Sequence, residues 1–227
     1  MANIMRFGGG SCEKVRYTAD VNPASGVTYV NGLAGLDASV VSRIAVAISD
    51  NPNITNTTDA IYFDLGPMHR KISVADQVTL TLNGTAYAFD VIGFNHDDLT
   101  SPADYGIITS TGKAGITFQM HDLFANVYAM NSENTNSGGW RSSAMRTSTM
   151  ATMRGYLPAA WQTVIKPVNK VSGTGGGSSS GTETVSDSCF LLAEIEIFGS
   201  TTHSVSGEGT QYAYYKTGNS KAKKLRG

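Results

Sequence analysis

The sequence is poor in charge and in cysteine. Only 15% of its 227 residues are charged, and the formal net charge is -1. Such a chain generates no global field that would attract a nucleic acid, a membrane surface or an acidic substrate. The two cysteines, Cys12 and Cys189, form no CxxC motif, which excludes a metal cluster built from cysteines alone. A disulfide between them stays open, and we favour two free thiols.

Long apolar segments are also absent. No run of 18 apolar residues occurs, so we expect no membrane span. Residues 1–17 lack an apolar stretch of signal-peptide length. We therefore expect synthesis in a cytoplasm, and a role outside the cell would need another route of release, such as assembly into a particle followed by lysis.

The residues that are abundant, glycine, serine, threonine and asparagine, favour a β-rich and loop-rich protein. Residues 1–36 predict an extended arm with one short strand near Tyr29. Asp37 resembles an N-cap, and a helix is predicted after it from apolar residues at helical spacing: Val40, Val41, Ile44, Ala47 and Ile48. We place a boundary after residue 57 and assign the arm and helix of residues 1–57 to particle docking or oligomerisation.

A β-hairpin is the clearest pattern in the sequence. Val78, Leu80 and Leu82 alternate with polar residues, and Tyr87, Phe89 and Val91 alternate on the return strand. Asn83-Gly84 between them is the strongest short signal for a hairpin turn. Residues 115–124 predict a further strand.

The second half predicts short helices and loops. Residues 142–168 indicate two short helices with a bend at Pro158; Met150, Met153 and Leu157 share one face, and Met145 is expected off that face. Residues 172–184 predict a flexible loop, and residues 189–199 predict a strand or a short buried helix. Because helices and strands mix without βαβ alternation, we expect an α+β fold.

Two His-Asp pairs are candidates for chemistry. His96 with Asp97, and His121 with Asp122, could converge on a divalent metal ion or take part in acid–base catalysis. The alternative is that these residues satisfy backbone groups at strand ends. A G-x-S-x-G match at 177–181 lies inside the Gly-Ser loop, without the strand and helix that a nucleophile elbow needs. Ser142 or Ser143 is expected to cap a helix.

Aromatic and arginine side chains are candidates for binding. Trp161 lies in a helical apolar stripe and is expected in the core, whereas Trp140 is either a buried plug or an exposed platform. The tyrosines of "QYAYY" alternate as in a strand with one wet face. The contact candidates are Trp140, Arg141, Arg146, Tyr212, Tyr214 and Tyr215.

Several blocks resemble a known family. These are "ISVADQVTLTLNGTAYAFDVIGFNHD", "GGWRSSAMR", "LPAAWQTVIKPVNK", "DSCFLLAEIEIFG" and "GEGTQYAYY". With "AIYFDLGPMHRKIS" before them, the resemblance covers roughly residues 61–215. The chain resembles an uncharacterised domain of prophages and gut Firmicutes, similar in appearance to the C-type-lectin-like and formylglycine-generating-enzyme-like folds. The resemblance implies a lectin-like domain over 58–227, built on an antiparallel hairpin core with two or three short helices.

The resemblance also implies differences. The family domain usually continues past this point, so we expect a truncated domain or one that a partner completes. The catalysis of formylglycine-generating enzymes needs a cysteine pair, and only Cys189 lies in the corresponding half.

From this resemblance we expect a non-enzymatic bacteriophage or prophage virion protein: a tail-fibre, receptor-binding or head-decoration component. It would reside in the virion and bind other virion proteins or a host-surface glycan or protein, as a homo-oligomer, by analogy a trimer. No cofactor and no nucleic acid is implied. The alternatives are a metal-dependent hydrolase using the His-Asp pairs and a bacterial surface adhesion module.

Overall fold

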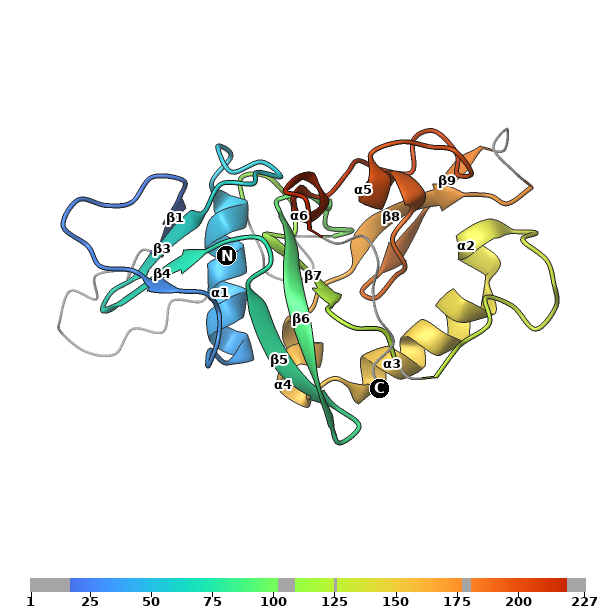
Figure 1. Cartoon of the computed structure of the whole chain (residues 1–227), viewed down its shortest axis with the longest axis horizontal. Helices are drawn as coiled ribbons and strands as arrows, with labels where there is room; N and C mark the ends of the chain where they lie inside the picture. The colour runs from blue at the N-terminus through green and yellow to red at the C-terminus, as the bar shows by residue number, and fades with distance from the viewer. Residues whose placement is uncertain (1–16, 102–108, 125, 177–180, 220–227) are drawn as a thin grey trace.

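A computed structural model describes residues 17–101, 109–124, 126–176 and 181–219. The fold is α+β, as predicted, with three small sheets and short helices arranged along one long axis (Figure 1). The first sheet, with strand order β1-β3-β4-β2, joins β1 (Thr18–Asp20), β3 (Ile61–Leu65), β4 (Met68–Ile72) and β2 (Val30–Asn31). Its pairings are antiparallel except between β2 and β4.

The predicted hairpin forms the central sheet. Strands β5 (Gln77–Leu82) and β6 (Thr85–Phe94) are antiparallel, and β7 (Ile116–Met120) pairs with β6. Asn83 and Gly84 between β5 and β6 both have positive φ angles, 46° and 84°, as a type I′ turn requires. The hairpin and the strand expected within 115–124 are thus confirmed.

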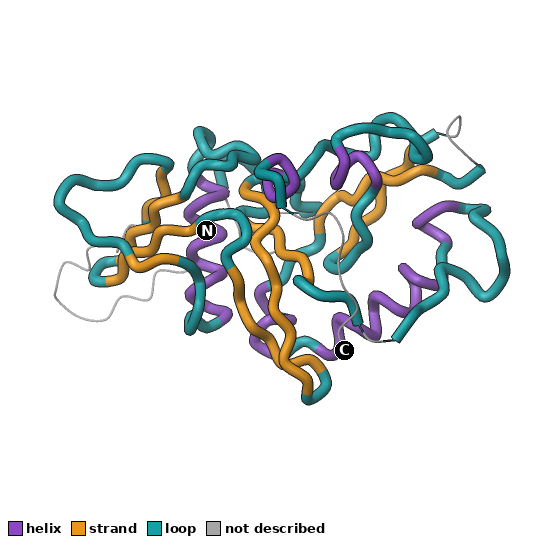
Figure 2. The backbone as a smooth tube through the Cα atoms, viewed as in Figure 1, coloured by secondary structure: helices purple, strands orange, loops and turns teal. Residues whose placement is uncertain are grey.

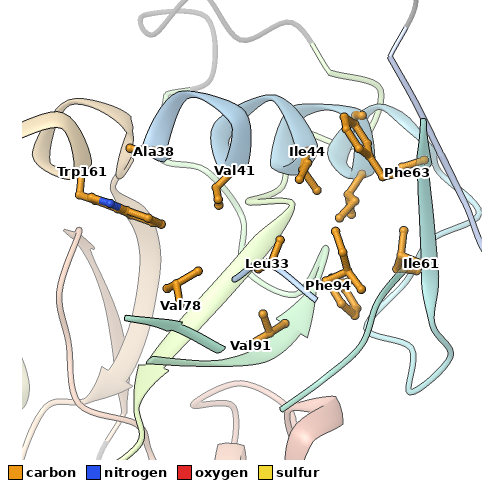
Figure 3. Packing of buried hydrophobic residues seen from close by; sticks show 14 of the residues in the cluster. Leu33, Ala38, Val41, Ile44, Ile61, Phe63, Val78, Val91, Phe94 and Trp161 are labelled. Carbon is orange, nitrogen blue, oxygen red and sulfur yellow. The ribbon is translucent and has the colours of Figure 1, made fainter. Parts of the chain in front are cut away.

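Helix α1 (Ala38–Asp50) packs across the first two sheets (Figure 3). The Asp37 carboxylate caps it by accepting a hydrogen bond from the Val40 N–H at 2.9 Å, as predicted. Its buried residues pack into one hydrophobic cluster with residues of later elements, including Phe63 of β3, Val91 of β6 and Trp161. Within residues 17–57, α1 therefore shares its core with elements that follow residue 57.

The glycine pair before Trp140 fits against the third sheet, in which β8 (Val168–Gly173) pairs with β9 (Thr182–Asp187). A Cβ atom on Gly139 would lie 2.0 Å from the Gly173 carbonyl oxygen, so this close approach requires glycine. The loop is shorter than the predicted range of residues 172–184, because β9 begins at Thr182. The Gly-Ser match at 177–181 lies mostly outside the described residues.

The described part of the second half contains short helices on either side of Pro158, as predicted. Trp140 lies in α2 (Gly139–Ser142), followed by a π-helical turn, η2 (Met145–Met150), then α3 (Ala151–Tyr156) and α4 (Ala159–Val164). The Ser143 hydroxyl accepts a hydrogen bond from the Arg146 N–H at 3.1 Å, which is the expected capping role. Pro158 separates α3 from α4, as predicted.

The segment 189–199 contains a helix, α5 (Glu194–Phe198), and the remaining helix is α6 (Ala213–Lys216). Figure 2 shows both as short helical turns joined by long loops. Among the described residues, no helix has the length and apolar character needed to cross a membrane.

The carboxylate of Glu194 organises the loop after α5. It accepts hydrogen bonds from the backbone N–H groups of Thr202, His203 and Ser204 at 2.8–3.1 Å. These bonds, the one from His203 foremost, lower the pKa of Glu194 to about 2.

We expect a carboxyl titration followed by NMR to give Glu194 a midpoint near 2. Because the folded-state pKa is depressed, its contribution to stability is present above the unfolded value of 4.5 and is lost as the pH falls toward 2. A midpoint of about 4 or above, close to the unperturbed value, would show that the carboxylate does not hold the loop.

Candidate functional site

A large apolar groove lies beside the central sheet. Its volume is about 630 Å³, which is within the range of ligand and peptide sites in proteins. One wall comes from α1 and from the β5–β6–β7 face that carries Phe89, Ile116 and Phe118. A second wall comes from η2, α3, α4 and residues 188–192, with Trp161 of α4 in contact with Phe118.

The π-helical turn places methionines in this wall. In a π-helix the hydrogen bonds span five residues, so positions five apart lie about one turn apart. Met145 therefore joins Met150 in one cluster, contrary to the expectation that Met145 faces elsewhere. Met153 also lines the groove. Methionine side chains are flexible and polarisable, so this wall can adapt to apolar partners of different shape.

The rim of the groove is apolar as well. Val127 is 87% exposed, and Leu123, Tyr128 and Leu191, which line the same groove, are 42–47% exposed. Isolated exposed apolar side chains are ordinary on a protein surface, but a contiguous group beside a groove indicates an interaction site.

The groove also contains polar groups at one end. Asp97, Lys113 and Thr117 are among its lining residues, and Lys113 Nζ lies 2.7 Å from Asp98 Oδ1. Cys189 lines the groove too, and burial raises the pKa of its thiol. The thiol is thus protonated at neutral pH. Cys189 is a free cysteine. Cys12, the other cysteine of the sequence, lies outside the described residues.

The other face of the central sheet holds the C-terminal tyrosine segment, residues 210–216. Tyr212 stacks on His96 with a ring separation of 3.7 Å, and its hydroxyl donates to Asp97 Oδ1 at 2.8 Å. Asn56 binds the segment's backbone on both sides of Tyr212, accepting from the Ala213 N–H and donating to the Gln211 carbonyl. The segment is therefore an integral part of the fold.

The three tyrosines proposed as contacts are consequently buried. Tyr212, Tyr214 and Tyr215 have exposed fractions of 0–5%. Their spacing forms a single helical turn rather than a strand with a wet face. Burial, with a contribution from Asp90, raises the pKa of Tyr214 to about 12. This corrects the expectation that the tyrosines form an exposed binding surface.

The His-Asp pairs form two separate contacts. His96 Nδ1 lies 2.9 Å from Asp97 Oδ1, as the sequence pairing suggests. His121 pairs instead with the buried Asp90, with Nδ1 3.0 Å from both carboxylate oxygens. Asp122 is among the residues that line the groove. Within the described part of the chain, no group of three or more His, Cys, Asp or Glu side chains could hold a metal ion.

Asp97 is nevertheless held as a carboxylate. Burial alone would raise its pKa, but hydrogen bonds from His96, Thr117 and Tyr212 outweigh the burial and lower it. These bonds join Asp97 to the interior of the fold. Both His96 and Asp97 therefore have a structural role.

Trp140 and Arg146 converge on one buried carboxylate. The Trp140 Nε1–H donates to Asp187 Oδ2 at 2.7 Å, and Arg146 Nε lies 2.9 and 3.0 Å from the two Asp187 oxygens. Trp140 packs with Met145 and Val185, so its indole is a core group rather than an exposed platform. Both residues therefore support the wall of the groove without lining it.

Arg141 remains the most exposed of the proposed contacts. Its guanidinium pairs with Glu183, and its Nη2 donates to the Thr184 carbonyl at 3.0 Å. Arg146 donates similarly to the Ser186 carbonyl, at 3.5 Å. The two arginines thus cover the outer carbonyls of β9, as charged side chains commonly do on an edge strand.

Sequence reasoning did not identify the apolar groove. Its residues come from α1, the central sheet, η2 to α4 and the 188–192 loop, and no local pattern joins them. The methionines at 145, 150 and 153 were the available signal. Helical spacing, however, placed Met150 and Met153 on one buried face and Met145 off that face.

Comparison with known proteins gives one match. Residues 114–226 match the model of a family described as a domain of unknown function, DUF6273. No curated protein and no solved structure gives a significant match to the chain. The matched residues begin just before β7 and include the methionine wall, so the chain is similar to DUF6273 proteins over β7, the methionine wall and the C-terminal tyrosine segment.

Proposed function

We propose that the chain is a non-enzymatic binding protein whose apolar groove holds an apolar segment of a partner protein. The observation that carries the proposal is that the groove continues into an exposed apolar rim at Leu123, Val127, Tyr128 and Leu191. A contiguous exposed apolar patch of this kind marks a surface that binds another macromolecule.

The chemistry of the groove favours a protein segment as its occupant. The methionine wall can repack around aliphatic or aromatic anchors, as in helix-in-groove recognition. A strongly charged segment is disfavoured, because most of the lining side chains are apolar.

We further propose that the partner is another virion protein, and that the chain is a component of a bacteriophage or prophage particle. The sequence blocks that resemble a prophage domain support this, and their order is preserved along the chain. A C-type-lectin-like architecture, a trimeric assembly and a role in a tail fibre, in receptor binding or in head decoration belong to the same proposal.

Charge introduced on the rim should prevent incorporation into particles. Val127→Glu and Leu191→Glu leave folding unchanged, because both side chains are substantially exposed. We expect each to lower the amount of protein in purified virions by about tenfold, equivalent to about 1.4 kcal/mol of binding free energy. Quantitative mass spectrometry of particles measures the effect.

The matched control is Val30→Glu, since Val30 is 58% exposed and lies on β2 outside the groove. Its incorporation should equal that of the unmodified protein. Absence of the unmodified protein from virions contradicts the virion assignment. Normal incorporation of both rim variants contradicts the role of the groove.

A further inference from the structure

The first sheet has one face on the core and one face directed outward. Ile61, Phe63 and Ile72 are fully buried against α1. Because side chains alternate along a strand, Tyr62 and Asp64 on β3 point the other way. The register places Lys71 opposite Tyr62 and His69 opposite Asp64.

The two flanking strands extend this surface with polar side chains. Asp20 on β1 lies opposite Tyr62, and Asn31 on β2 lies beside Lys71. We call these six residues the outer face: Asp20, Asn31, Tyr62, Asp64, His69 and Lys71. Each can form hydrogen bonds, and none is aliphatic, which is the opposite of the apolar groove.

Tyr29 adds a second aromatic ring in a fixed orientation. Its ring stands at 72° to the rings of Tyr62 and His69, with centroid distances of 5.0 and 5.8 Å. Its hydroxyl donates to Asp64 Oδ2 at 3.1 Å and accepts from the Ala24 N–H at 3.1 Å. The same Asp64 carboxylate also contacts His69 Nδ1. The aromatic and polar groups are therefore ordered before any ligand arrives, which lowers the entropic cost of binding.

The charges of the outer face bear on the choice of ligand. Two carboxylates, Asp20 and Asp64, repel a polyanion, while Lys71, 6.0 Å from the centre of the Tyr62 ring, offsets part of their charge, so the face has no strong field of either sign. An apolar protein segment would leave the polar groups without partners. A neutral ligand with many hydroxyls satisfies both donors and acceptors, and its C–H surface can pack on an aromatic ring.

We propose that the outer face binds a neutral oligosaccharide, with a sugar ring packed on the Tyr29–Tyr62 pair and its hydroxyls bonded to the surrounding polar side chains. This site lies within residues 20–71, outside both the apolar groove and the segment that matches DUF6273. It does not depend on the proposed role of the groove.

Titration of the full-length chain with neutral oligosaccharides tests the proposal. The probes are oligomers of N-acetylglucosamine, glucose and galactose, followed by NMR chemical shifts of the tyrosines and by calorimetry. We expect binding to at least one series with a Kd of about 1 mM or tighter. Tyr62→Ala should weaken it by about tenfold, and Tyr62→Phe, which keeps the ring, should retain it.

Asp20→Ala, at an exposed position, tests the polar contacts without risk to the core and should also weaken binding. Tyr156→Ala is the matched control, because that tyrosine is 37% exposed and lies on α3, away from the first sheet. Absence of binding to all three series overturns the proposal. So does binding that survives both Tyr62→Ala and Asp20→Ala, or stronger binding of heparin than of any neutral series.

Discussion

Replacement of Asp187 by alanine is expected to lower the free energy of unfolding by about 3 kcal/mol, measured by urea denaturation. The Asp187 side chain is 9% exposed and accepts hydrogen bonds from Trp140 and Arg146. Its removal leaves a largely buried guanidinium and a buried indole N–H without this acceptor, and such groups pay their full desolvation cost. The packing of Met145 against Trp140 would also weaken.

Glu183→Ala is the matched control on the same strand. It breaks the ion pair with Arg141, whose side chain is 50% exposed. Exposed ion pairs contribute little to stability, so we expect the free energy of unfolding to fall by less than about 1 kcal/mol. Equal losses for the two variants would show that burial does not distinguish these pairs and that Trp140 is not anchored by Asp187.

Tyr212→Ala is expected to cost about 4 kcal/mol, because a fully buried aromatic side chain leaves a cavity that the surroundings fill only in part. Gly93 contributes to the tight fit: a Cβ atom there would lie 2.9 Å from the Tyr212 ring. Tyr212→Phe keeps the ring stacked on His96 and removes only the bond to Asp97, so a loss of about 1–2 kcal/mol is expected.

Urea denaturation with Tyr156→Ala as the exposed reference measures both changes. A loss below about 1 kcal/mol for Tyr212→Ala would contradict the burial of the C-terminal tyrosine segment, since buried aromatic truncations are consistently more costly. It would also restore these tyrosines as candidate surface contacts.

The hairpin turn and the helix cap could be predicted from neighbouring residues alone. Asn83-Gly84 needs positive φ angles that few residues other than Asn and Gly adopt readily, and Asp37 caps α1 with its own side chain. These signals do not depend on the rest of the chain, and both predictions are confirmed.

Elements determined by tertiary contacts were predicted less well. Met145 was assigned to the wrong side because an α-helical period was applied to a π-helical turn. The tyrosines at 212, 214 and 215 alternate as in a strand, yet Asn56 and Asp97, more than 100 residues earlier, hold them in a buried turn. No sequence window contains both sets of residues.

The candidate sites show the same limit. Asp90 rather than Asp122 pairs with His121, because β6 and β7 are antiparallel neighbours that bring the two side chains together. The outer face joins Tyr29 to Asp64 across 35 positions of sequence. Strand register and helix packing bring together the residues of both the apolar groove and the outer face. Composition and the spacing of neighbouring residues do not predict these long-range contacts.

We propose that the apolar groove holds a segment of a partner protein in the particle. A photo-reactive amino acid at Val127, with Val30 as the position outside the groove, tests this most directly in assembled virions. We expect a crosslink from position 127 to one apolar segment of a single virion protein, and none from position 30. Crosslinks of equal yield from both positions, or none from position 127, would contradict it.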